Sequence, residues 1–134
     1  MNLVCVDPEK VEKIWPHVSM FLQSAYVRGS GDDDLESLKR DLDDKKALLW
    51  VVWDGNGIIA AAATKLIKTS TKIVCVIAAC GGRDLVKWLP FIADLESYAK
   101  AENCDEMRVM GRHGWQKFLP EYYQPWVCLA KRLK

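Results

Sequence analysis

The 134-residue sequence lacks an excess of charge of either sign, because 19 lysines and arginines nearly balance 18 aspartates and glutamates for a formal net charge of +1. A strongly basic surface is the usual mark of a protein that binds nucleic acid or an anionic membrane. The local basic cluster Lys131, Arg132 and Lys134 is more simply a strand end in water. We therefore expect no nucleic-acid partner.

Long apolar runs are also missing. No run approaches the roughly 18 residues that span a membrane, and no basic segment followed by an apolar core opens the sequence. The five cysteines are odd in number and contain no C-x-x-C pair, which predicts free thiols and no metal site. We expect a cytoplasmic protein without a membrane partner.

Half of the residues are apolar, which is enough for one core in a single domain over residues 1–134. Two helix starts lie in the first third of the chain. Asp7-Pro8-Glu9 supplies a cap, a proline and an acid for the first helix, and Asp32-Asp33-Asp34, after Gly29-Ser30-Gly31, begins the second. Pro16 interrupts the first helical pattern, where we expect a kink or a restart.

Strand patterns follow an initial short strand at residues 3–6. Leu48–Trp53 and residues 58–67 flank Asp54-Gly55-Asn56-Gly57, a strong β-hairpin signal. Thr69-Ser70-Thr71 then turns the chain into a strand at residues 72–80. Gly81 and Gly82 lead from that strand into a long helical pattern and a strand at 106–110. A last helix and a strand at 126–133 complete the chain.

This order, β-α-α-β-β-β-α-β-α-β, predicts an α/β fold. An antiparallel meander followed by one βαβ crossover gives a mixed, mostly antiparallel sheet with helices on both faces. The turn at Gly81 and Gly82 has two interpretations. Its backbone N–H groups hold a phosphate at a helix start, or it only reverses the chain.

The element order, the D-G-N-G hairpin and the C-terminal pattern resemble the GNAT superfamily of N-acetyltransferases over nearly the whole chain. Two strings, Gly-Gly-x5-Trp-Leu at residues 81–89 and Gly111-Arg112-His113-Gly114-Trp115, are similar to those of small GNAT-like proteins of phages and prophages. The C-terminus departs from the family, because one strand follows Pro125 where the family usually has a two-stranded arm.

In the family, acetyl-CoA lies between the fourth and fifth strands, and backbone amides before the third helix hold its pyrophosphate. The resemblance implies acetyl-CoA as the cofactor, with binding residues Cys80, Gly81, Gly82, Arg83, Asp84 and Lys87. The family's six-residue loop is incomplete here. Asp84 competes with an anion at the helix start, and Arg83 and Lys87 offset it with positive charge.

The resemblance also implies catalytic residues. Family members often use a tyrosine of the fourth helix as general acid and a strand carboxylate as base. Tyr122 and Tyr123 lie nearest the tyrosine position, and Tyr122 is preferred because we expect Tyr123 to pack in the core. The fourth strand has no carboxylate, so His113 is a candidate base, although a loop histidine that caps a helix is the simpler interpretation.

Two functions therefore fit the sequence. One is an acyl-CoA-dependent N-acetyltransferase, or a CoA-binding relative, with a small-molecule or peptide amine as acceptor. The other is a non-catalytic phage or prophage protein, such as a virion or morphogenesis component in the host cytoplasm or virion, that binds a protein partner. The shortened loop, the missing carboxylate and the abbreviated C-terminus favour the second, and the glycine pair beside Arg83 favours the first.

Overall fold

The computed structural model describes residues 1–27, 32–111 and 113–134 and shows a five-stranded mixed sheet with the order β1-β2-β3-β4-β5. Neighbouring strands are antiparallel from β1 to β4, and β4 pairs with β5 in parallel. The strands are β1 Asn2–Cys5, β2 Leu48–Trp53, β3 Ile58–Lys68, β4 Ile73–Gly82 and β5 Glu106–Val109. The predicted α/β class, with a meander and one parallel crossover, is confirmed.

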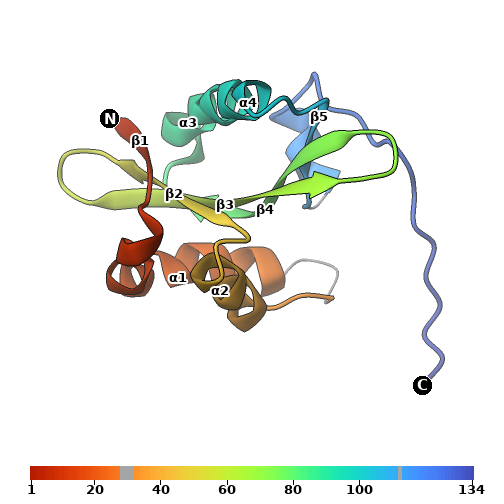
Figure 1. The fold of residues 1–134 in the computed structure, drawn as a ribbon, viewed down its shortest axis with the longest axis horizontal. Coiled ribbons are helices and arrows are strands. Elements are labelled where there is room, and N and C mark those ends of the chain that lie inside the picture. Colours follow the sequence, from red (N-terminus) through yellow and green to blue (C-terminus); the bar gives the residue numbers. More distant parts are fainter. Residues whose placement is uncertain (28–31, 112) are drawn as a thin grey trace.

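Helices cover both faces of the sheet (Figure 1). Helices α1 (Val11–Val27) and α2 (Leu35–Asp43) lie on one face, and α3 (Leu85–Trp88) and α4 (Ile92–Ala101) lie on the other. Three short 3-10 helices are η1 Pro8–Lys10, η2 Leu89–Phe91 and η3 His113–Lys117. The larger core, under α1 and α2, includes the fully buried Val18, Leu22, Leu38, Leu42 and Leu49.

Both predicted helix caps are present. The carboxylate of Asp7 accepts a hydrogen bond from the Glu9 N–H at 2.9 Å, and that of Asp34 accepts one from the Ser37 N–H at 2.8 Å. The restart at Pro16 is not found, because α1 passes through it as one helix. Beyond Pro16, Val18 and Leu22 are fully buried, and their packing outweighs one lost backbone hydrogen bond. Residues 29–31 lie outside the described part.

The predicted hairpin is confirmed between β2 and β3. The Asp54 carboxylate accepts hydrogen bonds from the N–H groups of Asn56 and Gly57, at 2.8 and 2.9 Å. Gly55 adopts φ +98°, a value that glycine adopts without strain. The Thr69 side chain likewise organises the turn before β4 by accepting from Lys72 N at 3.0 Å.

Three expectations about the second half of the chain are wrong. Gly81 and Gly82 end β4 and pair with β3, so they do not form the turn. The following helical pattern divides into α3, η2 and α4, because Pro90 interrupts it, and the longest helix is α1. Residues 126–133 pair with no strand in the described part of the chain, and the end of this segment extends away from the domain (Figure 1). No helix within the described ranges is long and apolar enough to cross a membrane.

Candidate active site

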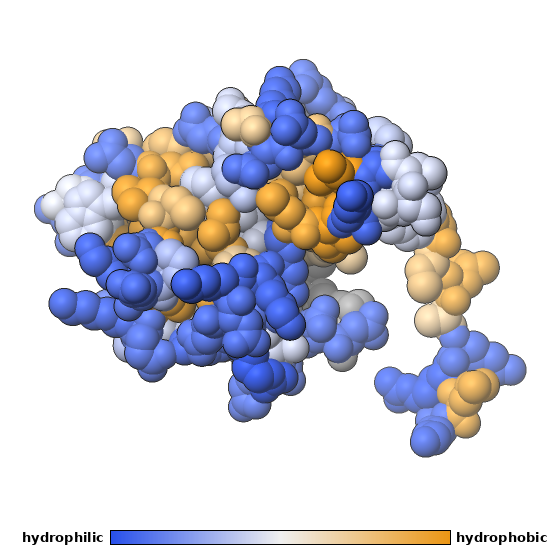
Figure 2. Space-filling view, in the orientation of Figure 1, coloured by the Kyte–Doolittle hydropathy of each residue, from blue (hydrophilic) through white to orange (hydrophobic). Residues whose placement is uncertain are grey.

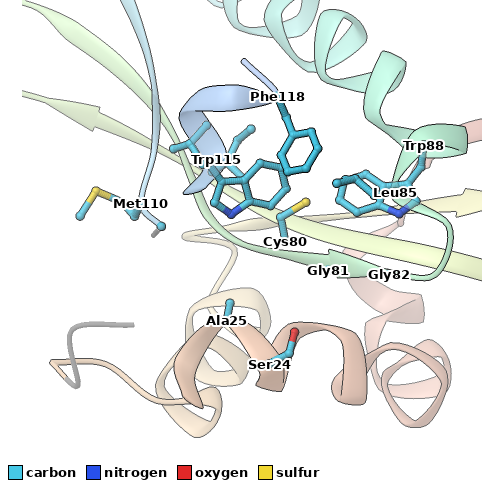
Figure 3. Close-up of a pocket in the computed structure, with 13 residues that line it drawn as sticks. Ser24, Ala25, Cys80, Gly81, Gly82, Leu85, Trp88, Met110, Trp115 and Phe118 are labelled. Carbon is cyan, nitrogen blue, oxygen red and sulfur yellow. The ribbon is translucent and has the colours of Figure 1, made fainter. Parts of the chain in front are cut away.

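Strands β4 and β5 separate after a short paired stretch. Val74–Ile77 of β4 pairs with Glu106–Val109, and Met110 N donates to Ile77 O at 3.2 Å just beyond. From there β4 continues to Gly82 and pairs with β3 alone. A β-bulge lies at this point, because Ala78 of β4 is an extra residue opposite the Ala63–Thr64 step of β3. A cavity of about 230 Å³ occupies the resulting opening (Figure 3).

The main chain of β4 presents N–H groups to this opening. Arg83 N donates to Ile59 O at 2.7 Å, which identifies Gly82 and Ala60 as a pair whose own N–H groups point away from each other. Because the direction of the N–H group alternates from residue to residue along a strand, the Cys80 N–H points the same way as the Gly82 N–H. The N–H groups of Gly82 and Cys80 therefore face away from β3, on the side where β4 has separated from β5.

The two glycines serve packing at the end of β4. A Cβ on Gly81 would lie 2.2 Å from the Phe21 carbonyl oxygen of α1, and a Cβ on Gly82 would lie 2.5 Å from Ala60 Cβ of β3. Both values are shorter than real Cβ contacts, so only glycine fits at either position. Gly81 brings α1 against β4, and Ser24 and Ala25 of α1 thereby line the cavity.

Aromatic rings form another wall of the cavity. The Trp88 and Trp115 ring centroids are 6.2 Å apart, and those of Trp115 and Phe118 are 6.4 Å apart (Figure 3). A Cβ on Gly111 would lie 2.8 Å from the Trp115 ring, so Gly111 makes room for the indole. Trp88 Nε1 is buried without a hydrogen-bond partner among the described residues. It offers an unused donor beside the cavity.

The segment after β4 is a poor phosphate cradle as it stands. The Arg83 N–H is already bonded to Ile59, and its guanidinium lies 5.7 Å from the Phe21 ring and 3.4 Å from Ile58 O. Asp84 adopts the left-handed conformation at φ 55° and precedes a helix of only four residues. Lys87 Nζ lies 3.7 Å from the Asp84 carboxylate, and both side chains are largely exposed.

Cys80 lines the cavity but is a weak nucleophile. Burial raises the pKa of its thiol to about 12, so the reactive thiolate is scarce near neutral pH. Within the described lining no side chain is a carboxylate, a histidine or a tyrosine. The polar groups that line the cavity are therefore the backbone N–H groups of β4, the Ser24 and Cys80 side chains and the indole N–H groups of Trp88 and Trp115.

Tyr122 and Tyr123 have exchanged their expected environments. Tyr122 packs against the core beneath α4, and its hydroxyl donates to Glu96 Oε2 at 2.5 Å. Burial first, and then this hydrogen bond, raise the pKa of Tyr122 well above its ordinary value near 10. Tyr123 is 70% exposed, so the expectation that it packs in the core is wrong. Neither tyrosine lines the cavity, and their catalytic roles remain predictions. The His113 side chain lies outside the described part.

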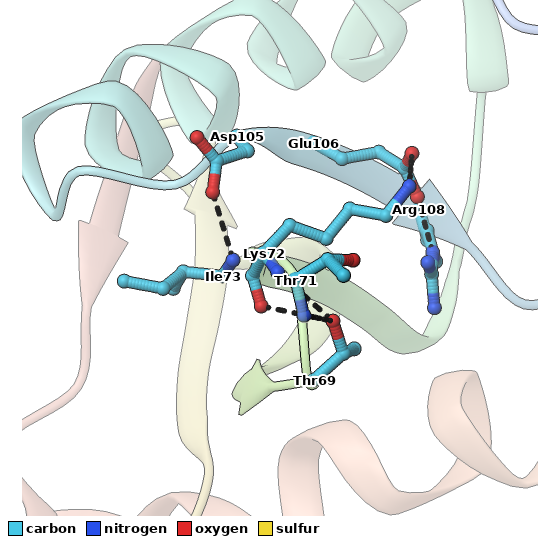
Figure 4. A network of polar contacts seen from close by, with 7 residues as sticks. All are labelled: Thr69, Thr71, Lys72, Ile73, Asp105, Glu106 and Arg108. Carbon is cyan, nitrogen blue, oxygen red and sulfur yellow. Dashed lines mark hydrogen bonds and ion pairs between the residues drawn. The ribbon is translucent and has the colours of Figure 1, made fainter.

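Asp105 and Glu106 have structural partners (Figure 4). The Asp105 carboxylate accepts from Ile73 N at 2.9 Å and joins the start of β4 to β5. Glu106 binds Lys72 Nζ at 2.9 Å and also Arg108, whose hydrogen bond, followed by that of Lys72, lowers the pKa of the Glu106 carboxyl. Both carboxylates therefore make structural contacts at the start of β4 and β5.

Comparisons with known proteins establish the fold. No protein-family model matches the sequence, and no curated protein is a recognisable sequence relative. A probable acetyltransferase superposes with a TM-score of 0.69 at 14% identity, covering 100% of this chain and 99% of that one. The chain has a GNAT-like fold.

Two further acetyltransferase structures agree. An aminoglycoside acetyltransferase from an uncultured soil metagenomic sample, in complex with sisomicin, has a TM-score of 0.68 at 13% identity and covers 99% of this chain and 96% of its own. Glucosamine-6-phosphate N-acetyltransferase from Arabidopsis thaliana has a TM-score of 0.66 at 10% identity, with 99% and 98% covered. At these identities the likeness shows the fold alone. It lends no support to the phage and prophage resemblance.

Several residues of the cavity have no signal in the sequence. Ser24 and Ala25 reach it only because α1 crosses the end of β4. Phe118 and Met110 have no motif of their own. The close approach required by Gly81 is the one local signal from which the α1 contact is predictable.

Proposed function

We propose that this protein is an acyl-CoA-dependent N-acetyltransferase that places the acyl-pantetheine arm in the opening between β4 and β5. One observation carries the proposal: the N–H groups of Cys80 and Gly82 face a cavity at the point where two parallel strands separate. The full-length likeness to acetyltransferase structures supports it. The acceptor is an amine of a small molecule or a peptide.

The cavity fits the arm of the cofactor better than the nucleotide. Its volume of about 230 Å³ is below the ~300–1,000 Å³ typical of sites for whole drug-sized ligands. A narrow amide-containing chain matches a slot with backbone donors on β4 and aromatic rings on another wall. The nucleotide then stays near the surface, where Arg83 and Lys87 provide positive charge for its phosphates.

The transfer needs few side chains. The amine nitrogen attacks the thioester carbonyl carbon, a C–N bond forms and the C–S bond breaks. The Cys80 N–H stabilises the negative charge that develops on the carbonyl oxygen. The amine loses a proton to a base, and the sulfur leaves as a thiolate that takes up a proton. An alkyl thiol with a pKa of about 8.5 is a tolerable leaving group without strong acid help.

The proton carriers are proposed from the resemblance. His113 is the candidate base, and Tyr122 or Tyr123 is the candidate acid. Tyr122 has to release its hydrogen bond to Glu96 before it protonates a thiolate, and its raised pKa opposes the transfer. The Tyr123 ring is 70% exposed. Substitution of each tyrosine by phenylalanine separates the two roles.

A second candidate function has one specific observation in its favour. Because the described cavity lining contains no carboxylate, histidine or tyrosine, the protein is also suited to bind CoA, or a protein partner, without catalysis. Such a protein has the GNAT-like fold but does not catalyse acetyl transfer.

Thiol release from acetyl-CoA tests the proposal. The acceptor panel covers aminoglycosides, amino-sugar phosphates and peptide N-termini, the classes suggested by the structural neighbours. We expect amine-dependent thiol release with at least one class and a matching acetylated product by mass spectrometry. Binding of CoA without thiol release across the panel would support the non-catalytic function. The proposal is overturned if the protein shows no CoA binding and no thiol release.

A further inference from the structure

The indole N–H of Trp88 is a hydrogen-bond donor that the described part of the chain leaves unused. Its nitrogen, Nε1, is buried without a hydrogen-bond partner, and the residue as a whole is only 5% exposed. Folded proteins rarely keep such a group, because a buried donor that loses its bond to water and gains no other bond destabilises the fold. The position therefore calls for an acceptor that another molecule supplies.

The neighbours of Trp88 explain why no side chain accepts this hydrogen bond. Trp88 ends α3 and packs against Val52 of β2 and against Ile59 and Ala60 of β3, none of which carries a polar side-chain atom. On another side Trp88 lines the cavity of about 230 Å³ between β4 and β5. A ligand in that cavity is in a position to supply the acceptor.

The Trp88 ring has space to meet such a ligand. Trp88 also lines a second cavity, of about 20 Å³, beneath α4, so the ring borders free space on two sides. The nitrogen lies on the edge of the ring that faces β4 (Figure 3). Because the nitrogen is buried, a small tilt of the ring is needed to bring the N–H to a group that lies along β4.

The lining of the larger cavity selects a neutral ligand group. None of its described residues carries a charged side chain, so an ion that entered would lose its hydration without gaining a counter-charge. Hydrophilic side chains lie instead on the outer surface, as Figure 2 shows over α2. A neutral group with a carbonyl oxygen, such as an amide, satisfies the Trp88 donor without that cost.

The position of Trp88 along the opening indicates which carbonyl group it meets. Trp88 packs against Ala60, the residue of β3 that pairs with Gly82, so it lies over the last residue of β4. Cys80, whose N–H faces the thioester oxygen in the proposed mechanism, is two residues away along the strand, which is about 7 Å. The group beside Trp88 is therefore the part of the arm that follows the sulfur, where the first amide lies.

We propose that the Trp88 indole N–H donates a hydrogen bond to the amide carbonyl oxygen of the pantetheine arm that lies nearest the sulfur. This bond fixes the arm in the register that places the thioester carbonyl at the Cys80 N–H. The inference rests on the proposed function and adds a binding residue to the same site.

Two-dimensional ¹H–¹⁵N NMR of the indole groups tests the contact directly. The chain has six tryptophans, and the Trp88 signal is identified by side-chain assignment and by its loss in Trp88→Phe. We expect saturating acetyl-CoA to move the Trp88 N–H proton downfield, because hydrogen bonding deshields the proton. The Trp53 signal is the control, since Trp53 is 43% exposed on β2 and does not line the cavity.

This measurement separates the inference from the proposed function. A Trp88 signal that keeps its position while calorimetry shows the site to be saturated overturns the inference and leaves the proposed function standing. A protein that binds neither acetyl-CoA nor CoA and releases no thiol overturns both. Because the wild-type chain is used, the result is decisive even where Trp88→Phe fails to fold.

Binding affinity identifies the carbonyl group. Trp88→Phe removes the N–H and retains an aromatic ring, and we expect it to raise the dissociation constants of acetyl-CoA, free CoA and pantetheine by about fivefold each, because all three contain the amide. Trp53→Phe is the matched control and should keep the wild-type constants. Equal constants for Trp88→Phe and the wild type, or an effect confined to acetyl-CoA, whose thioester the other two lack, would overturn the assignment to the amide.

Discussion

Gly81 lies so close to α1 that a Cβ on it would be 2.2 Å from the carbonyl oxygen of Phe21. This contact places α1 over the end of β4 and with it one wall of the candidate site. The oxygen belongs to the backbone of a 17-residue helix, so it does not yield as the end of a flexible side chain does.

We expect Gly81→Ala to lower the free energy of unfolding by about 1–3 kcal/mol, the usual cost of overpacking. Denaturant unfolding measures the change. Gly57→Ala is the matched control, because a Cβ there meets nothing within 4 Å and φ is not positive. The account of the α1 contact fails if the two variants have the same stability.

Arg83 provides a test of the phosphate site. We expect Arg83→Glu to weaken acetyl-CoA binding by about tenfold or more, because a charge-assisted contact is replaced by repulsion. Rising salt should weaken wild-type binding in the same direction. Arg40→Glu is the control, because it makes the same change of charge at an exposed position of α2 that does not line the cavity. Equal acetyl-CoA dissociation constants for Arg83→Glu and the wild type would show that Arg83 does not contribute to acetyl-CoA binding.

We expect the Tyr122 hydroxyl to make the stability of the folded protein decrease at alkaline pH. Its pKa is raised in the folded protein, so the folded state holds this proton more tightly than the unfolded chain does. The resulting stabilisation is complete below about pH 10 and is lost as pH rises toward the folded-state pKa. We expect the free energy of unfolding to fall less steeply above pH 10 in Tyr122→Phe than in the wild type.

Tyr123→Phe is the control for this pH series, since its ring is exposed. Burial raises the pKa values of Tyr26 and Tyr98 to about 12, and these tyrosines contribute the same alkaline slope to all three proteins. The difference between Tyr122→Phe and Tyr123→Phe isolates the hydroxyl bonded to Glu96. Identical slopes would show that neither burial nor the bond to Glu96 holds the proton on Tyr122 in solution.

Local signals in the sequence predicted the first half of the fold well. Asp34 caps α2 and Asp54 closes the hairpin through side-chain hydrogen bonds to residues two or three positions away, so neighbouring sequence is sufficient. The strand pattern of β2 was predicted with its observed bounds, Leu48–Trp53.

The missed features depend on distant partners. Gly81 and Gly82 extend β4 because Ala61 and Ala60 of β3 lie opposite, a pairing that no local pattern specifies. The segment 126–133 has strand-forming residues but pairs with no strand among the residues that the structure describes. The cavity collects residues from α1, β4, β5 and η3, so the polar and aromatic members of its wall were not recognisable as a set.

Calorimetric titration of acetyl-CoA and free CoA tests the central claim most directly. Met110 is at the cavity and 60% exposed, so Met110→Trp narrows the opening without replacing a core residue. Met20→Trp, at a 65% exposed position on α1 that does not line the cavity, is the matched control. The account predicts saturable one-site binding to the wild type and to Met20→Trp, and binding weakened about tenfold or more in Met110→Trp. No binding to the wild type, or equal affinity in all three proteins, would contradict it.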